Sequence, residues 1–240
     1  MYSSVSVVVP VYNSEKSIPE LYSRLHGTLG RICDKYEIVM VDDGSMDNSL
    51  MVMHSLNADE NILRIIGLDG NFGQQNAIMC GLRHSAGDYI ITIDDDLQHP
   101  PEEIPKLLQE LDKGFDVVYG IPSNTKQRGI RNLGSCATDL FFTLVCFKPK
   151  DIKVGSFRAL RRHIVEKIIK EDNAFVYITA ITLKHTRRIA NVEVEHAGRR
   201  YGRSNYSFCK LIGLFFKLFV NYSGIPIKPR GSKAPQYIIK

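Results

Sequence analysis

Four times within the first 120 residues, a β-branched apolar run is followed by a polar loop and then by a segment with helical features. The apolar runs are residues 5–11, 37–41, 62–68 and 89–93, and the helical segments are residues 17–29, 49–56, 74–85 and 101–113. Residues 116–119 predict a further strand. Strands that alternate with helices of about 10–15 residues are typical of right-handed crossovers in a parallel sheet. The sequence therefore predicts an α/β fold with a mostly parallel central sheet flanked by helices.

The fourth apolar run, Tyr89–Ile93, leads directly into three aspartates and then, through Leu97-Gln98-His99, into Pro100-Pro101. Three adjacent carboxylates repel one another, so a cation that prefers oxygen ligands, such as Mg²⁺ or Mn²⁺, is their natural partner. In an extended segment alternate side chains share a face, which places Asp94 and Asp96 together, and Gln98 with them, while Asp95 points away. We therefore expect a metal site at Asp94 and Asp96. The alternative is a solvated acidic loop.

Polar or acidic residues also follow two other strands, at Tyr12-Asn13 and at Asp42-Asp43. In open parallel sheets, ligands bind beyond the carboxyl ends of the strands. These loops are therefore expected to converge on one site. No GxGxxG motif follows the first strand and no Walker A motif occurs, which argues against a dinucleotide or P-loop site.

Charge is distributed unevenly along the chain. The net charge of +5 combines about −11 in residues 1–120 with about +16 in residues 121–240. An acidic half suits metal coordination, and a basic half suits phosphates or an anionic membrane surface. The modules that would support nucleic-acid binding are absent, so we expect none.

The five cysteines are scattered without metal-ligand spacing, which predicts a reducing compartment and no zinc site. We find no signal peptide pattern and no apolar run of about 18 residues that could span a bilayer.

The second half is less regular. Its pattern predicts a polar, basic loop over residues 123–131, helices over 132–146 and 161–170, and a strand pair near 189–195. A glycine-punctuated loop then carries Arg199, Arg200 and Arg203 beside Ser204. Arginine suits bidentate phosphate recognition, so this loop could close over a pyrophosphate; the alternative is a solvated basic turn.

Residues 208–223 have the apolar spacing of an amphipathic helix with bulky aromatic side chains and flanking lysines. Such a helix can lie in a membrane interface or close the domain core, and the sequence leaves both open. Residues 224–240 contain three prolines and several basic residues and are expected to form a basic tail.

In combination, five motifs give the chain a resemblance to the family 2 inverting glycosyltransferases of GT-A fold. Within that family it is most similar to the polyprenyl-phosphate subgroup, which acts on dolichyl or undecaprenyl phosphate. The resemblance covers about residues 4–228. The motifs are Val9-Pro10-Val11-Tyr12-Asn13, residues 41–47, Asn71-Phe72-Gly73-Gln74-Gln75, residues 94–101 and residues 200–206.

The resemblance implies roles for individual residues. The implied nucleotide-binding residues are Pro10, Tyr12, Asp42, Asp43, Asn71, Asp94, Asp95 and Ser204, with Asp42 at the base and Asp43 near the ribose. The implied metal ligands are Asp94, Asp96 and Gln98. The implied catalytic residues are Asp95, Arg131, Arg158 and Arg200, where Arg128 is interchangeable with Arg131. Arg131 and Arg158 would meet the acceptor phosphate, and Asp95 would be the base only if the acceptor were a hydroxyl.

The implied organisation is a glycosyltransferase domain over residues 1–207, divided into a nucleotide and metal half (1–120) and an acceptor half (121–207). A membrane-interface helix (208–223) and the basic tail (224–240) follow. The implied activity moves a sugar from a nucleoside-diphosphate sugar to a polyprenyl phosphate, with Mg²⁺ or Mn²⁺, at the inner face of the cell membrane. This places the protein in the cytoplasm as a peripheral membrane protein, and whether it forms a homo-oligomer stays open.

Two other functions compete with this one. A transferase that uses a saccharide hydroxyl, as in capsule or O-antigen assembly, would share the donor chemistry but not need a lipid phosphate. A non-catalytic nucleotide-sugar-binding protein at the membrane surface would bind the donor without turnover.

Overall fold

The computed structural model describes residues 1–56, 59, 61–123, 142–143, 148–172, 175–198, 213, 217–222 and 236–240. The strands are β1 (Tyr2–Val11), β2 (Cys33–Asp42), β3 (Leu63–Gly67), β4 (Tyr89–Thr92), β5 (Val117–Pro122), β6 (Arg158–Arg161) and β7 (Ile189–Val194). The helices are α1 (Ile18–Ile32), α2 (Ser49–His54), α3 (Gln74–His84), the short 3-10 helix η1 (Pro101–Glu103), α4 (Ile104–Asp112), α6 (Arg162–Ile168) and α7 (Ile178–His185).

The strands form one sheet in the order β3-β2-β1-β4-β6-β5-β7. β1 pairs in parallel with β2 and β4, β2 with β3, and β5 with β7, whereas β6 runs antiparallel between β4 and β5. The predicted α/β class and the mostly parallel sheet are therefore confirmed.

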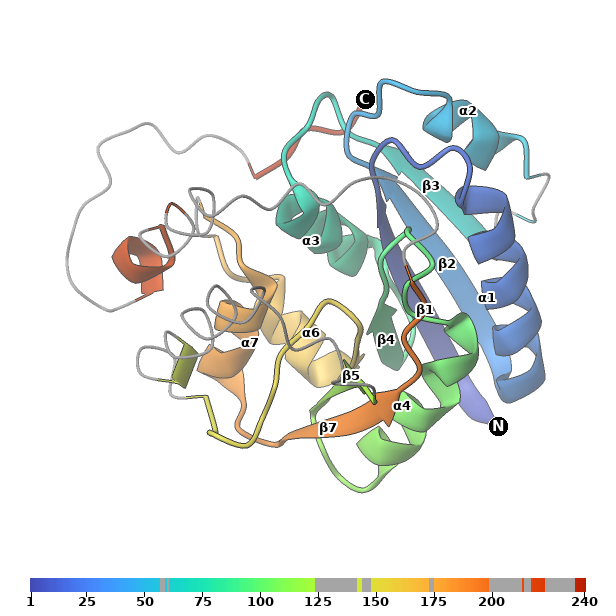
Figure 1. Cartoon of the computed structure of the whole chain (residues 1–240). Coiled ribbons are helices and arrows are strands. Elements are labelled where there is room, and N and C mark those ends of the chain that lie inside the picture. The colour runs from blue at the N-terminus through green and yellow to red at the C-terminus, as the bar shows by residue number, and fades with distance from the viewer. Residues whose placement is uncertain are drawn as a thin grey trace.

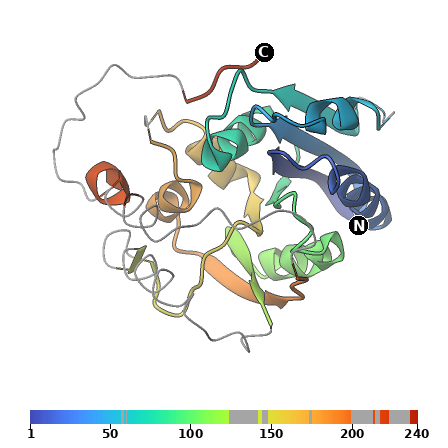
Figure 2. The ribbon, with the colours of Figure 1, turned by 45° about the horizontal axis from the view of Figure 1, so that its top comes forward.

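Helices cover both faces of this sheet, as Figures 1 and 2 show from two directions. Helices α1 and α4 pack on one face, where they bury Val5, Val7 and Val9 of β1. Helices α3, α6 and α7 pack on the other face, which receives Val8 of the same strand together with Val39 and Val41 of β2. The alternation along β1 therefore supplies both cores, as expected for a strand buried on both sides.

The second half departs from the sequence-based prediction in three elements. β6 and α7 were not predicted, and the segment expected to form a strand pair near 189–195 contains the single strand β7, which pairs with β5. β6 is four residues long and has an arginine at each end, which hides its strand pattern. Residues 178–183 of α7 are all buried, so this part of the helix lacks the polar face that marks a helix in sequence.

The C-terminal residues were expected to lack structure, yet residues 236–240 lie along the edge strand β3. The backbone N–H of Lys240 donates to the carbonyl of Gly67 (2.9 Å), and that of Asp69 donates to Ile238 (2.8 Å). Part of the edge is thereby paired. The rest of the predicted tail lies outside the described residues.

Residues 217–222 are helical and belong to the predicted interface helix. Leu218 is 1% exposed and lies in the core beside α7. The hydroxyl of Tyr222 donates to the carbonyl of Phe175 (2.8 Å) and accepts from the N–H of Tyr177 (3.1 Å). This part of the helix therefore packs on the domain, which was the second of the two alternatives. Membrane contact by residues 208–223 stays a prediction. Among the helices that can be described, none has the length and apolarity to cross a bilayer.

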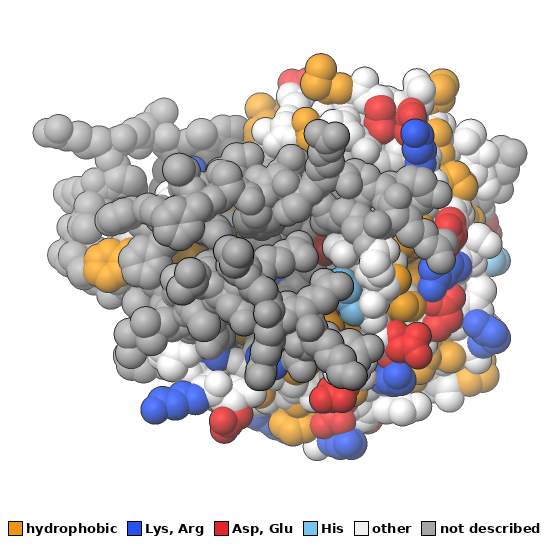
Figure 3. All heavy atoms as spheres, viewed as in Figure 1, with side chains coloured by type: hydrophobic (Ala, Val, Ile, Leu, Met, Phe, Trp, Pro, Cys, Tyr) orange, Lys and Arg blue, Asp and Glu red, His pale blue; other side chains and the backbone are white. Residues whose placement is uncertain are grey.

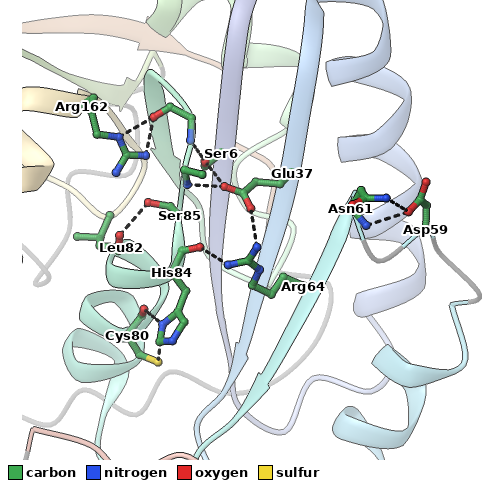
Figure 4. A network of polar contacts seen from close by, with 12 residues as sticks. Ser6, Glu37, Asp59, Asn61, Arg64, Cys80, Leu82, His84, Ser85 and Arg162 are labelled. Carbon is green, nitrogen blue, oxygen red and sulfur yellow. Dashed lines mark hydrogen bonds and ion pairs between the residues drawn. The ribbon is translucent and has the colours of Figure 1, made fainter.

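A polar network fixes the end of the sheet opposite the carboxyl ends of β1 and β2 (Figure 4). Glu37 accepts hydrogen bonds from the hydroxyl of Ser6 and the N–H of Ala86, each at 2.6 Å. Arg64 donates to the carbonyl of His84 (2.8 Å), and Arg162 donates to that of Gly87. The connection from α3 to β4 is thus tied to three strands and to α6, which makes this end a rigid base.

We predict opposite effects on stability from two Gly→Ala substitutions in helices. A Cβ at Gly81 of α3 would collide with the side chain of Val8 in the tightly packed core, whereas a Cβ at the exposed Gly27 of α1 would meet nothing. Gly81→Ala should therefore lower the free energy of unfolding by about 1–3 kcal/mol. Gly27→Ala should raise it by about 0.5–1 kcal/mol, because alanine favours a helix interior. Denaturant titration of both variants measures this, and equal effects would contradict the close packing of α3 on β1.

Candidate active site

The loops that follow β1, β2 and β4 meet at one edge of the sheet. The N–H of Asp43 donates to the carbonyl of Val11 (2.8 Å), and that of Leu68 donates to Asp42 (2.9 Å). The N–H of Tyr12 donates to the carboxylate of Asp95 (3.1 Å). The three polar loops singled out in the sequence therefore come together, as the parallel order of β2, β1 and β4 requires.

Asp43 holds the loop that leads into α3. Its two carboxylate oxygens accept from the N–H groups of Phe72 (2.7 Å) and Gly73 (2.9 Å), just before the helix begins. Asp43 is 3% exposed, and this burial raises its pKa to about 6, although the two backbone hydrogen bonds act in the opposite direction. Asp43 thus fixes the loop around Asn71. Its predicted contact with a ribose stays untested.

Asp42 is also buried, and its oxygens face the N–H of Ser45 (both 3.3 Å). The turn between them needs Gly44, whose φ is +70°. A Cβ there would lie 2.5 Å from the carbonyl carbon of Gly70 and 2.8 Å from the nitrogen of Asn71. The loops after β2 and β3 therefore touch through backbone at a position that only glycine fits.

Among the described residues, two side chains from distant parts of the sequence hold Asp94. Gln74 Nε2 donates to one of its carboxylate oxygens (2.6 Å), and Ser156 Oγ donates to the other (2.5 Å). Gln74 is the first residue of α3, and Ser156 precedes β6. Each oxygen of a carboxylate has two lone pairs, so these bonds are compatible with a cation on the other side.

Asp95 faces a different direction, toward the loop after β1. Its carboxylate accepts from the N–H of Tyr12 (3.1 Å), and the hydroxyl of Ser14 donates to the carbonyl of Tyr12 (3.2 Å). Burial and then the neighbouring charges of Asp94 and Asp96 raise its pKa to about 6. Asp95 thus ties β1 to the acidic turn.

The acidic segment is less extended than the sequence predicts. β4 ends at Thr92, a turn begins at Asp95, and Leu97 has a positive φ of 59°. The alternation of side chains expected for an extended segment therefore does not determine the direction of the Asp96 side chain. Its carboxylate accepts from the N–H of Gln98 (3.1 Å). Within the described part of the chain, no three His, Cys, Asp or Glu side chains form a metal-binding group. The oxygen donors Asp94, Asp96 and Gln98 suit a hard cation such as Mg²⁺ or Mn²⁺ that also takes ligands from a diphosphate. Their role as metal ligands stays a prediction.

The other predicted nucleotide residues lie around this edge. Pro10 is buried in β1 opposite Val41, Tyr12 is 39% exposed, and Asn71 is exposed at the loop before α3. Asn13 and Met46 link the first two loops, because the N–H of Met46 donates to Asn13 Oδ1 (2.8 Å). The arrangement leaves Tyr12 and Asn71 accessible to a ligand.

Arg158, predicted at the acceptor phosphate, is 1% exposed within the sheet. Its guanidinium donates to the hydroxyls of Thr92 (3.1 Å) and Thr179 (3.2 Å) and lies 5.7 Å from the ring centre of Tyr119. In this structure it is surrounded by protein, so a phosphate contact would require the side chain or its cover to move.

Arg131, Arg200 and Ser204, together with Arg128, lie outside the described residues. The chain approaches the predicted Arg200 loop from beside the acidic turn. The N–H of Ala197 donates to the carbonyl of Gln98 (2.9 Å), and the rings of His196 and His99 meet edge to face at 5.1 Å.

The residues that hold Asp94 were not predicted from the sequence. Gln74 belongs to a motif that was recognised, but only Asn71 of that motif was given a role. Ser156 is separated from Asp94 by 62 positions, and no local pattern marks it.

Comparison with known proteins agrees with this arrangement. The family model described as "Glycosyl transferase family 2" matches residues 6–169. A curated relative, undecaprenyl-phosphate 4-deoxy-4-formamido-L-arabinose transferase of Proteus mirabilis (strain HI4320), is 37% identical over 227 residues. That alignment covers 94% of this chain and 70% of the relative.

Solved structures with a similar fold include glucosyl-3-phosphoglycerate synthase from Mycobacterium tuberculosis. The complex with Mn²⁺, UDP and phosphoglyceric acid has a TM-score of 0.69 and 18% identity, and the match covers 94% of this chain and 80% of that one. The complex with Mn²⁺ and UDP-glucose has a TM-score of 0.67 and 17% identity, with 99% and 86% covered. These likenesses confirm the predicted GT-A fold.

The substitution Asp43→Asn tests the anchor of the α3 loop. An amide nitrogen cannot accept a hydrogen bond, so the variant should lose about 1–3 kcal/mol of unfolding free energy at low pH. Because the pKa of Asp43 is raised in the folded protein, ionisation opposes folding. The stability that Asp43 contributes is fully present below its unfolded pKa and is lost as the pH rises through about 6. Asparagine does not titrate, so the difference between variant and wild type should narrow from about pH 4 to about pH 7.

Thermal or chemical unfolding at several pH values measures this difference. Asp95 titrates in both proteins, so its contribution cancels. A difference that widens with rising pH would show that the hydrogen bonds to the ionised carboxylate outweigh its burial.

Proposed function

The chain belongs to glycosyl transferase family 2, and from this membership we propose that it moves a sugar from a nucleoside-diphosphate sugar to a polyprenyl phosphate. The observation that carries the proposal is the match, over 94% of the chain, to a transferase named for undecaprenyl phosphate. The structure supports it by bringing Asp42, Asp43 and Asp94 to the ligand-binding edge of the sheet.

We assign the donor to the loops after β1, β2 and β3. Pro10, Tyr12, Asp42, Asp43 and Asn71 would line the nucleoside, and the acidic turn would face the diphosphate. This assignment is supported by the accessible positions of Tyr12 and Asn71 and by the similar fold of proteins that hold UDP or UDP-glucose.

Asp94, Asp96 and Gln98 would hold a divalent cation, Mg²⁺ or Mn²⁺, because all three offer oxygen ligands. A cation bound there would offset the negative charge that develops on the departing diphosphate. Mn²⁺ in the similar structures supports this role. Gln74 and Ser156 fix the orientation of Asp94 before any ligand binds.

The acceptor phosphate supplies an anionic oxygen as the nucleophile. The bond from the anomeric carbon to the diphosphate breaks as the bond to the acceptor oxygen forms, and one in-line displacement inverts the anomeric configuration. Little general-base help is needed, which fits the position of Asp95, whose carboxylate accepts from the N–H of Tyr12 in the loop after β1. Arg131, Arg158, Arg200 and Ser204 keep their proposed roles at the acceptor phosphate and in the closing loop.

A lipid acceptor would place the protein at the inner face of the cell membrane. Acidic and basic side chains are intermixed along the described right-hand and lower edge of the molecule in Figure 3, so this edge does not mark a membrane surface. We assign membrane contact to residues 208–223, whose described part docks on the domain through Leu218 and Tyr222.

The proposal is tested by nucleoside diphosphate release from a panel of UDP-, GDP- and dTDP-sugars. Each donor is assayed with Mg²⁺ or Mn²⁺, with and without undecaprenyl phosphate, and after chelation. We expect release that requires both the cation and the lipid phosphate. Asp96→Ala should reduce it at least about 100-fold, because several kcal/mol of charge stabilisation depend on the cation. Asp34→Ala, an exposed aspartate near the opposite end of β2, is the matched control and should retain full activity.

The other outcomes distinguish the alternatives. Transfer to a saccharide without any lipid phosphate would favour the hydroxyl-directed transferase. Donor binding with no release under any condition would favour the non-catalytic protein. Release by Asp96→Ala at the wild-type rate would contradict the assigned cation site.

A further inference from the structure

Two adjacent glutamines at the start of α3 point to different parts of the molecule. Gln74 Nε2 donates to the carboxylate of Asp94 at 2.6 Å. Gln75 Oε1 accepts from the N–H of Ile178 at 2.9 Å, and Ile178 is the first residue of α7. One glutamine is thus used as a donor and the other as an acceptor. The first turn of α3 therefore contacts both the acidic turn, through Gln74, and the second half of the chain, through Gln75.

The contact at Ile178 satisfies a group that the helix cannot satisfy itself. The first N–H groups of a helix lack partners within it, and the N-cap residue Tyr177 provides no side-chain cap to α7. Gln75 caps the helix from outside. The neighbouring N–H, that of Tyr177, donates to the hydroxyl of Tyr222 (3.1 Å), which in turn donates to Phe175 (2.8 Å). The start of α7 is therefore held by α3 on one side and by the helix of residues 217–222 on the other.

The same helix turn is fixed from the nucleotide side. Asp43 binds the N–H groups of Phe72 and Gly73 directly before Gln74. These two hydrogen bonds fix the backbone from which the Gln74 side chain extends. The Gln74 amide donates to one carboxylate oxygen of Asp94, and the Ser156 hydroxyl donates to the other. Groups that hold a metal ligand in this way set its orientation and its affinity for the metal.

We infer that Gln74 is a positioning residue for the cation ligand Asp94 and that Gln75 makes this positioning depend on the docking of α7. The inference rests on the proposed function, because that function assigns Asp94 to the cation. Under this inference, the contacts that position α7 and the helix of residues 217–222 also affect the orientation of Asp94. They do so through the first turn of α3, which carries both glutamines.

The test is the dissociation constant of Mn²⁺ for the full chain, measured by electron paramagnetic resonance without sugar donor or lipid. Gln74→Met keeps the length of the side chain but removes the donor. It should weaken Mn²⁺ binding about 10-fold or more, as is typical when a group that orients a metal ligand is lost. Gln75→Met should weaken it less. The double variant should bind Mn²⁺ no more weakly than Gln74→Met alone, because Gln75 is inferred to affect Asp94 only through Gln74.

A conservative substitution separates the roles of the pair. Gln75→Glu keeps an oxygen acceptor for the N–H of Ile178, and a carboxylate is favourable in the first turn of a helix. It should therefore bind Mn²⁺ as the wild type does, unlike Gln75→Met. Gln109→Met, at an exposed position of α4, makes the same chemical change away from the site and should have no effect. Thermal unfolding of each variant checks that a weaker Mn²⁺ affinity does not result from loss of the folded structure.

If the expected changes in Mn²⁺ affinity are absent, Asp94→Asn shows whether the cation site or the positioning role of the glutamines is wrong. If Asp94→Asn weakens Mn²⁺ binding but Gln74→Met does not, the inference is overturned while the cation site stands. Additive losses in the double variant, or a Gln75→Glu variant as weak as Gln75→Met, would overturn the link through Gln75. If the wild type binds no Mn²⁺, or Asp94→Asn binds it normally, the cation site itself is wrong and the inference falls with it.

Discussion

The buried and half-buried carboxylates at the carboxyl edge of the sheet each need hydrogen-bond donors, and the loops of the site are arranged around that need. Asp43 takes two backbone N–H groups from the loop after β3, and Asp95 takes one from the loop after β1. Asp94 takes side-chain donors from α3 and from the segment before β6. Each acidic residue thereby joins two segments that are distant in sequence. The carboxyl groups that suit the site to a cation therefore also hold its loops together through the hydrogen bonds that they accept.

The antiparallel strand β6 makes one of these connections geometrically available. In a wholly parallel sheet, every strand would have its carboxyl end, and none its beginning, at the edge where Asp94 lies. Because β6 runs the other way, the residues just before it, including Ser156, reach the carboxyl end of β4, where Arg158 pairs with Thr92. The reversal therefore brings a segment of the second half of the chain into direct contact with the acidic turn.

The sequence was most informative where one physical requirement dominated. Buried parallel strands must be apolar and β-branched, so β1 to β5 could be predicted, and so could the meeting of their polar carboxyl ends. The elements β6 and α7 could not be predicted, because a four-residue strand that begins and ends with arginine, and a helix whose residues 178–183 are all buried, carry no periodic signal. The partners of Asp94 were equally hidden. Gln74 lies 20 positions away and Ser156 lies 62 positions away, and only the packing of α3 and β6 brings them together.

Arg158 shows how the structure accommodates a buried positive charge near the acidic turn. A buried guanidinium is costly unless polar groups surround it, and here hydroxyls of Thr92 and Thr179, the carbonyl of Ser156 and the ring of Tyr119 do so. Ser156 contacts Arg158 through its carbonyl and Asp94 through its hydroxyl. Ser156 therefore couples the surroundings of the buried guanidinium to those of the proposed cation ligand, and one residue before β6 positions both charged groups.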